Sequence, residues 1–114
     1  MYERSKQIDC FHIRGFQYWD GALVVSQMKV GDALEIQAED DNPHDPDAVA
    51  LYFEGSKLGY VPASNNAFLA QLLYFGHTDV VEARVLQVDL DEGPWNQVRV
   101  GLFIKDAREF SFED

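Results

Sequence analysis

Apolar and polar residues alternate along much of the chain, which is the pattern of β-strands with one buried face. Three segments show it, at residues 33–38, 48–53 and 97–104. In the first of them, Leu34 and Ile36 share one face and Glu35 lies on the other. The pattern predicts half-buried strands at all three places.

The longest run of this kind, over residues 80–90, changes phase partway along. Val85 ends one apolar set, and Leu86 begins a second set that points to the opposite face. A change of face within one strand predicts a β-bulge or a strong bend, as occurs where a sheet closes into a barrel. Turn residues at 91–94 then join this run to the last strand as a hairpin.

One helix is predicted between the strands. Five apolar residues follow helical spacing: Phe68, Leu69, Leu72, Leu73 and Phe75. The helix is expected over residues 65–75, with capping residues among 62–66 and Gly76 at its end. A shorter helix over residues 21–28 is a weaker prediction, because Val24 and Val25 are poor helix formers.

The order of these elements predicts a mostly β fold with one or two helices. Five or six short strands with an inserted α-helix suit a small OB-like or SH3-like β-barrel. The length of 114 residues allows a single domain over 1–114, with a core at about residues 8–105 and an acidic tail at 106–114. Phe110 and Phe112 in that tail are expected in a disordered end or in an edge strand of a dimer.

Composition narrows the setting of the chain. No apolar run approaches the roughly 20 residues that span a bilayer, and the first residues lack the apolar segment of a signal peptide. The single cysteine, Cys10, cannot form an internal disulfide and is expected to be a buried, inert thiol. These features indicate a cytoplasmic protein with no membrane partner.

The charge of the chain is strongly negative, at −11 from 20 acidic and nine basic residues. Such a chain is repelled on average by the nucleic-acid backbone and by anionic membranes. The negative charge is typical of a solubility surface. It disfavours nonspecific coating of DNA but leaves room for a local basic pocket.

The most distinctive stretch is the loop and strand at residues 41–51. Pro43 and Pro46 fix their own φ angles and hold the residues before them extended. Asn42 and Asp45 are expected to fold their side chains back onto nearby backbone N–H groups as Asx turns. A loop stiffened in this way loses less entropy when its side chains meet a ligand.

Four stretches, in this order and spacing, together resemble the HIRAN family, whose members include stand-alone bacterial proteins. They are the glycine-aromatic turn at 15–21, residues 28–32, the Asn-Pro loop at 41–51 and Lys57-Leu58-Gly59-Tyr60-Val61-Pro62. The resemblance runs from about residue 10 to residue 100. It implies a modified OB-like barrel and a non-catalytic module that holds the 3′ end of single-stranded DNA, in DNA repair or replication-fork processing.

The resemblance also implies roles for individual residues. Tyr18 and Trp19 match the paired aromatic residues that stack on terminal bases, and such stacking contributes about 1–3 kcal/mol per base. Asp45 matches the acid that accepts a hydrogen bond from the free 3′-hydroxyl. Each role has an alternative: one ring of the pair can belong to the core, and Asp45 can serve only as an Asx-turn acceptor.

Four further residues complete the implied site. Gln17 stands where DNA-binding members carry a basic residue, and His44 stands where they carry an aromatic residue. Asn42 is expected chiefly to form the loop. Tyr60 is expected chiefly to pack in the core, with a place in the DNA groove as the alternative.

The sequence departs from the family pattern in charge. Pro62 and Ala63 stand where a second basic residue is expected, which leaves Arg14 and Lys57 as the nearby bases. Five acids crowd the same region: Glu39, Asp40, Asp41, Asp45 and Asp47. Each missing phosphate contact weakens binding and flattens its salt dependence.

Three other hypotheses compete with DNA binding. The acidic loop is rich in oxygen ligands, but a calcium loop starting at Asp41 needs an acid where Tyr52 falls, so neither a metal nor another cofactor is expected. No nucleophile elbow or phosphate cradle indicates catalysis. The remaining alternative is an acidic protein-interaction module that has lost DNA binding and docks a basic protein or forms a homodimer.

Overall fold

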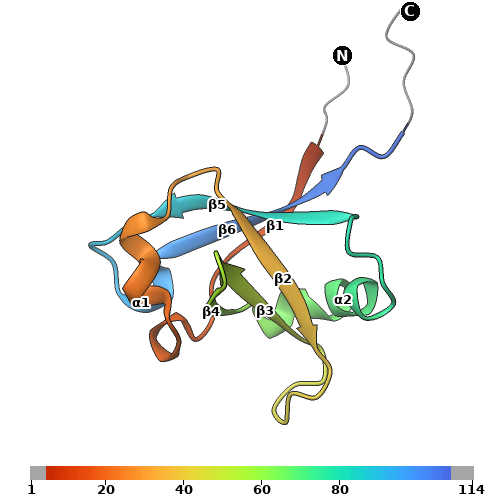
Figure 1. Cartoon of the computed structure of the whole chain (residues 1–114), viewed down its shortest axis with the longest axis horizontal. Helices are drawn as coiled ribbons and strands as arrows, with labels where there is room; N and C mark the ends of the chain where they lie inside the picture. The colour runs from red at the N-terminus through yellow and green to blue at the C-terminus, as the bar shows by residue number, and fades with distance from the viewer. Residues whose placement is uncertain (1–4, 109–114) are drawn as a thin grey trace, which may run out of the picture.

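The computed structural model describes residues 5–108 as one six-stranded antiparallel sheet with two helices (Figure 1). Strands lie in the order β1-β6-β5-β2-β3-β4. Their bounds are β1 Ser5–His12, β2 Ala33–Glu39, β3 Ala48–Phe53, β4 Ser56–Tyr60, β5 Val81–Val88 and β6 Val98–Lys105. The helices are α1 Gly21–Val24 and α2 Ala63–Tyr74, and the 3-10 helices are η1 Phe16–Tyr18, η2 Val25–Gln27 and η3 Pro94–Asn96.

The strands agree with the alternation of the sequence. β5 and β6 pair with a register shift between Val85 and Gln87, which confirms the bulge predicted from the change of phase. β3 differs from the half-buried strand that was expected, because all its residues except Tyr52 are buried. The helix α2 packs against β3 and contributes to this burial.

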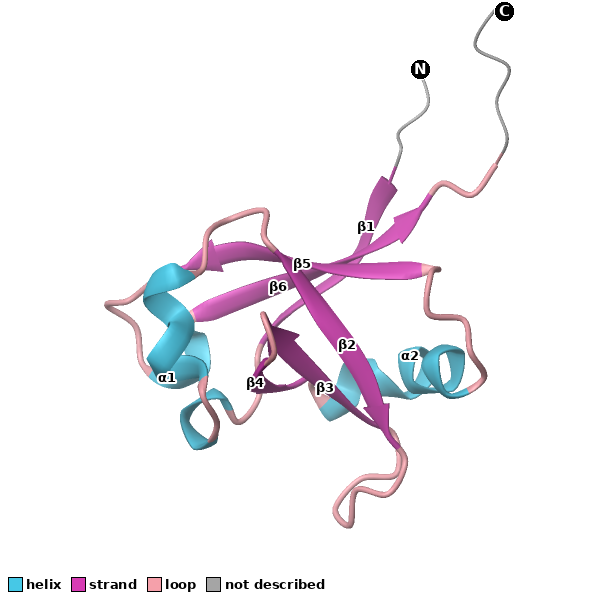
Figure 2. Ribbon diagram, viewed as in Figure 1, coloured by secondary structure: helices cyan, strands magenta, loops and turns pink. Residues whose placement is uncertain are grey.

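The expected closed barrel is not present. The sheet has two edges, β1 and β4, and it curls without joining them (Figure 2). After β1 the chain turns into η1, and within residues 5–108 a single isolated bridge, between Arg14 and Tyr60, links it to β4. The prediction of a small, mostly β fold with an inserted helix is therefore confirmed, and the OB-like closure is not.

The N-terminus of helix α2 has no side-chain cap, whereas its C-terminus is capped by backbone hydrogen bonds. Pro62 precedes it without a side-chain cap, so the predicted capping is wrong. Gly76 ends it as predicted, with φ of +91°. The N–H of His77 bonds to the C=O of Leu72 and the N–H of Gly76 to that of Leu73, which is the Schellman arrangement. The weaker helix expected at 21–28 is divided into α1 and η2.

A single apolar core joins all six strands to α2. Its largest fully buried side chains are Phe16, Ile13, Leu51, Leu58, Val49, Val85, Val98 and Val100. Two apolar residues of the predicted helix stripe, Phe68 and Phe75, are exposed instead. Cys10 is half-buried, not buried, and its sulfur lies 3.1 Å from a guanidinium nitrogen of Arg99.

Two further expectations concern the acidic tail and the membrane. Most of the acidic tail, with Phe110 and Phe112, lies outside the described residues. Within residues 5–108, no helix has the length and apolar character to cross a membrane.

Candidate functional site

The glycine-aromatic turn is held against the edge of β4. The backbones of Arg14 and Tyr60 exchange two hydrogen bonds of 2.9 Å. Gly59 permits this approach, because a Cβ there would lie 2.3 Å from the carbonyl oxygen of Arg14. A third bond, from the N–H of Asp20 to the C=O of Lys57, fixes the far side of the turn. The turn therefore has a defined position beside β4.

The loop between β2 and β3 is folded on its own side chains. The Asn42 Oδ1 accepts hydrogen bonds from the backbone N–H groups of His44 (2.8 Å) and Asp45 (3.1 Å). The Asp45 Oδ1 accepts one from the N–H of Asp47 (2.9 Å). These bonds confirm the predicted Asx turns and hold the loop folded on itself.

Two side chains of helix α2 donate hydrogen bonds to this loop. The Nδ2 of Asn66 donates to the Oδ2 of Asp45 (2.8 Å), and the Nε2 of Gln71 donates to the Oδ1 of Asp47 (3.1 Å). Sequence analysis assigned Asn66 to capping and missed this role. The available signal was its position three residues before Leu69, on the apolar stripe of the helix.

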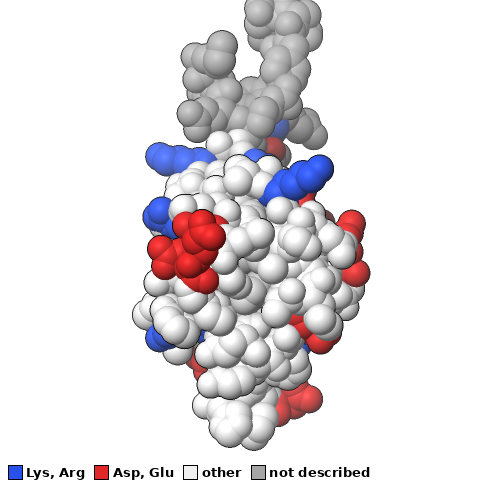
Figure 3. All heavy atoms as spheres, turned by 90° about the vertical axis from the view of Figure 1, so that its left-hand side faces the viewer, with Lys and Arg blue, Asp and Glu red and all other residues white. Residues whose placement is uncertain are grey.

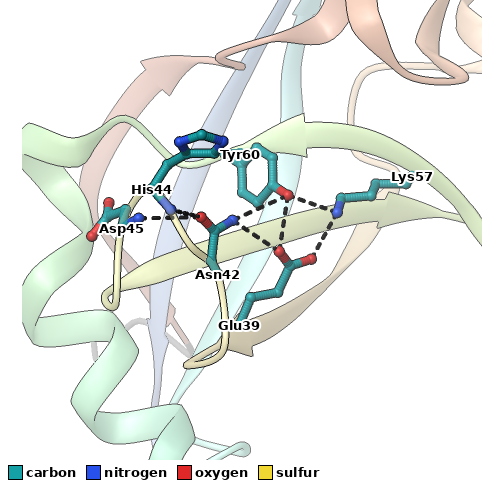
Figure 4. A network of polar contacts seen from close by, with 6 residues as sticks. All are labelled: Glu39, Asn42, His44, Asp45, Lys57 and Tyr60. Atoms are coloured by element: carbon teal, nitrogen blue, oxygen red, sulfur yellow. Dashed lines mark hydrogen bonds and ion pairs between the residues drawn. The ribbon is translucent and has the colours of Figure 1, made fainter.

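A polar network joins the loop to the strands beside it (Figure 4). The Lys57 Nζ lies 2.7 Å from a carboxylate oxygen of Glu39 and 2.8 Å from the Tyr60 hydroxyl, which in turn donates to Glu39 (2.9 Å). The Nδ2 of Asn42 donates to Glu39 (3.2 Å) and lies 3.5 Å from the Tyr60 hydroxyl. The network, Glu39–Asn42–Lys57–Tyr60, thus connects β2, the loop and β4.

The pKa values of this network follow from burial and its hydrogen bonds. Burial on its own raises the pKa of Glu39, but hydrogen bonds from Lys57, Tyr60 and Asn42 outweigh it and hold that pKa below its ordinary value. Burial lowers the pKa of Lys57, and the bonds to Glu39 and Tyr60 outweigh it in the upward direction. Burial raises the pKa of Tyr60. All three groups keep their ordinary charges at neutral pH.

Trp19 covers the network from the solvent side. The ammonium of Lys57 lies 3.9 Å from the centre of the Trp19 ring, a cation–π contact. The Trp19 and Tyr60 rings meet edge to face at 6.1 Å, with an interplanar angle of 72°. Lys57 thus covers one face of the Trp19 ring, while 43% of the residue stays exposed.

The loop, the turn and α2 surround one pocket of about 360 Å³, which we call the polar pocket. Its lining residues are Arg14, Trp19, Asn42, His44, Asp45, Ala48, Tyr60, Val61, Ala63 and Asn66. The structure thus brings together five of the residues that the sequence analysis put forward: Trp19, Asn42, His44, Asp45 and Tyr60. Tyr60 is half-buried, with its hydroxyl in the polar network and not in the apolar core.

Gln17 and Tyr18 do not line the polar pocket. Both lie on η1 and are exposed, Tyr18 to 78%. Neither Tyr18 nor Trp19 is a core residue, although one of them was considered as such; Phe16 takes that place at 1% exposure.

A smaller hollow, of about 280 Å³, shares Arg14 with the polar pocket. Its lining residues are His12, Arg14, Pro62, Ser64, Asn65, Trp95 and Asn96. Trp95 is 61% exposed on η3, which lies next to η1. Sequence analysis missed Trp95, although a tryptophan directly after the Gly93-Pro94 turn is a signal of an exposed ring. Each of the two hollows has a tryptophan in its lining, Trp19 in the polar pocket and Trp95 in the smaller hollow.

The acids near the site are less crowded than the sequence suggested. Asp45 alone of the five lines the polar pocket. Glu39 is paired with Lys57, Asp47 receives the amide of Gln71, and Asp40 lines a separate hollow with α2. On the face shown in Figure 3, a wide central area carries neither acidic nor basic side chains.

The polar pocket combines an acidic, a basic and an aromatic side chain: Asp45, Arg14 and Trp19. The carboxylate of Asp45 offers acceptor positions, and the guanidinium of Arg14 makes no hydrogen bond or ion pair within residues 5–108. The Trp19 ring supplies a flat apolar surface. In the same part of the chain, no three His, Cys, Asp or Glu side chains gather as metal ligands would.

Comparison with known proteins identifies a family for this chain and solved structures with a similar fold. No curated protein matches the chain. A protein of known structure from Lactobacillus plantarum is 23% identical, with a TM-score of 0.71, over 88% of this chain and 94% of that one. The HIRAN domain of human HLTF is 18% identical, with a TM-score of 0.59, over 90% of this chain and 77% of that one. The family model of the HIRAN domain matches residues 10–105. The chain belongs to the HIRAN domain family.

Proposed function

We propose that the polar pocket binds the 3′-hydroxyl end of single-stranded DNA, as a non-catalytic module acting in DNA repair or fork processing. HIRAN domains are a DNA-binding family, and this supports DNA as the ligand class. The observation that carries the proposal is the convergence of Asp45, Trp19 and Arg14 on one pocket.

The three groups match three parts of a strand end. The Trp19 ring stacks on the terminal base, a contact worth about 1–3 kcal/mol that tolerates any base. The Asp45 carboxylate accepts a hydrogen bond from the terminal hydroxyl, and charge assistance makes such a bond short and strong. The Arg14 guanidinium pairs with the phosphate that precedes the last nucleotide.

Asp45 also excludes other ends. A terminal phosphate in its place would bring two anions within hydrogen-bond distance, which is repulsive. A continuing strand would place a phosphodiester there, with the same result. The pocket therefore selects a free hydroxyl by attraction and rejects the alternatives by repulsion.

The smaller hollow extends this arrangement to the preceding nucleotide. Arg14 lies between the two hollows, and Trp95 supplies a second exposed ring. The path from Trp19 past Arg14 to Trp95 suits a backbone between two stacked bases.

Binding of short labelled oligonucleotides tests the proposal. Fluorescence anisotropy at low salt is measured with a 3′-hydroxyl strand and with the same strand bearing a 3′-phosphate. We expect tighter binding of the hydroxyl strand. Asp45→Asn removes the negative charge at nearly constant shape, so it should bring the two dissociation constants together while the fold is kept.

Equal affinity of the two strands for the unaltered chain contradicts the proposal. Absence of binding to both contradicts it more broadly and favours the competing hypothesis of an acidic module that docks a basic protein or a second copy. Thermal unfolding of Asp45→Asn is the control for the fold, because Asp45 also accepts bonds from Asp47 and Asn66.

A further inference from the structure

We infer that Asn66 is a positioning residue that fixes the Asp45 carboxylate and thereby sets the preference of the polar pocket for a hydroxyl end. The inference rests on the proposed function and deepens it. It assigns the specificity of the pocket to a side chain on α2, outside the motifs of the loop and the turn.

Burial marks Asn66 as unusual. It is 3% exposed, and it is the one polar residue within residues 5–108 that is buried as a whole. Leu69 and Ala70, on the same helix stripe, are apolar and also buried. A buried amide is costly unless it is hydrogen-bonded, so the side chain is held to its partner. That partner is the Oδ2 of Asp45, at 2.8 Å.

The carboxylate of Asp45 is held at both oxygens. Its Oδ1 receives the N–H of Asp47, a residue of the same loop, and its Oδ2 receives Asn66 from the helix. Each carboxylate oxygen can accept two hydrogen bonds, so one acceptor position per oxygen remains for a ligand. Without Asn66, only a bond within the loop would orient the carboxylate, and its plane could rotate away from the ligand hydroxyl.

Gln71 provides a matched comparison on the same helix. Its amide also donates to the loop, to the Oδ1 of Asp47 at 3.1 Å. Gln71 is exposed and does not line the polar pocket, whereas Asn66 lines it. The two amides therefore separate support of the loop in general from orientation of Asp45 in particular.

The experiment measures the ratio of the dissociation constants for 3′-phosphate and 3′-hydroxyl strands. Asn66→Leu, which keeps the size of the side chain, and Asn66→Ala should lower this ratio about 3- to 10-fold, the effect of one hydrogen bond. Gln71→Ala should leave it unchanged. In an Asp45→Asn background, Asn66→Leu should have no further effect, because it acts through Asp45.

The outcomes separate this inference from the function on which it rests. A ratio near one for the unaltered chain refutes the proposed function, and the inference with it. A clear preference that survives Asn66→Leu, or one that Gln71→Ala lowers equally, overturns the inference alone. If Asn66→Leu changes the ratio of dissociation constants further in the Asp45→Asn background, the inference is also overturned, because Asn66 would then act on the ligand without Asp45.

A measurement on the unaltered chain covers the case in which both Asn66 variants fail to fold. The side-chain NH₂ resonances of Asn66 in a ¹⁵N–¹H spectrum report on its bond to Asp45. They should shift when the hydroxyl strand is added and shift less with the phosphate strand. Resonances that stay in place with the hydroxyl strand at saturation overturn the inference.

Discussion

Two hollows of nearly equal volume border α2, and they differ in the polarity of the side chains that line them. The polar pocket has a volume of about 360 Å³, and the second, which we call the apolar groove, has about 340 Å³. The lining of the apolar groove is Ile8, Asp9, Asn65, Phe68, Leu69, Leu72, Val80, Val81, Leu102 and Ile104. Of the residues of α2, Asn66 lines the polar pocket and Phe68 lines the apolar groove.

The difference lies in how the side chains are held. Around the polar pocket, the side chains of Asp45, Asn42 and Tyr60 are each held by hydrogen bonds with another element or within the loop. Phe68, in the apolar groove, is 76% exposed. A site that recognises a specific group needs fixed donors and acceptors, whereas an apolar surface alone gives little specificity. The two hollows therefore differ in how their polar groups are held and not in volume, and this difference is why we propose the polar pocket as the site.

Substitution of one aromatic residue in each hollow tests most directly which of the two binds DNA. Trp19→Ala should weaken binding of the 3′-hydroxyl strand by about 1–3 kcal/mol, roughly 5- to 150-fold, because a stacking surface is lost. Phe68→Ala, the matched change in the apolar groove, should leave the affinity unchanged. Anisotropy titrations of the two variants give both numbers. Equal losses for the two variants would contradict the assignment of the site.

The fold was predictable from the sequence where a regular period carried the signal. The phase change after Val85 predicted the bulge, and Gly76 predicted the end of α2. The open edge of the sheet was not predictable, because alternation indicates strands but not their partners. The chain turns into η1 after β1 and contacts β4 through the Arg14–Tyr60 bridge, and no period in the sequence reveals either feature.

The site was predictable in its motif and not in its partners. The Asn-Pro loop pointed to Asn42, His44 and Asp45, and all three line the pocket. The pairing of Glu39 with Lys57 depends on the register of β2, β3 and β4, which sequence spacing does not specify. Spacing alone therefore leaves Glu39 without a partner, and the bond of Asn66 to Asp45 depends on how α2 packs against the loop.

A second way to sharpen the comparison is to weaken the network under Trp19. Glu39→Gln keeps the shape but removes the charge that pairs with Lys57, so it should lower the free energy of unfolding by about 1–2 kcal/mol at pH 7. The more exposed pair formed by Glu82 and Arg84 is the control, and Glu82→Gln should cost about 0.5 kcal/mol or less. Urea unfolding measures both.

The pH dependence of this effect has a definite sign. The pKa of Glu39 is lower in the folded chain than its ordinary value of 4.5. Its stabilising contribution is therefore fully present above pH 4.5 and is lost as the pH falls through the lower folded-state value. The difference between the unaltered chain and Glu39→Gln should shrink over that acidic window. A difference that is constant with pH would contradict a role for the charge.

A smaller effect is expected from Arg14. It is the one Lys or Arg residue that lines the polar pocket within residues 5–108, so about one phosphate should be neutralised there. The logarithm of the binding constant should then fall with the logarithm of salt concentration at a slope of about −0.7. Arg14→Gln should bring the slope close to zero. A steep slope that survives the substitution would mean that phosphates are bound elsewhere.

The most direct measurement of the central claim is a ¹⁵N–¹H NMR titration of the chain with a short strand that ends in a free 3′-hydroxyl. We predict that the indole N–H of Trp19 and the backbone amides of His44 and Asp45 shift, while the amides of Phe68 and Ile104 stay in place. Shifts that gather on Phe68 and Ile104, or a spectrum unchanged at high strand concentration, would contradict the assignment of the polar pocket as the binding site.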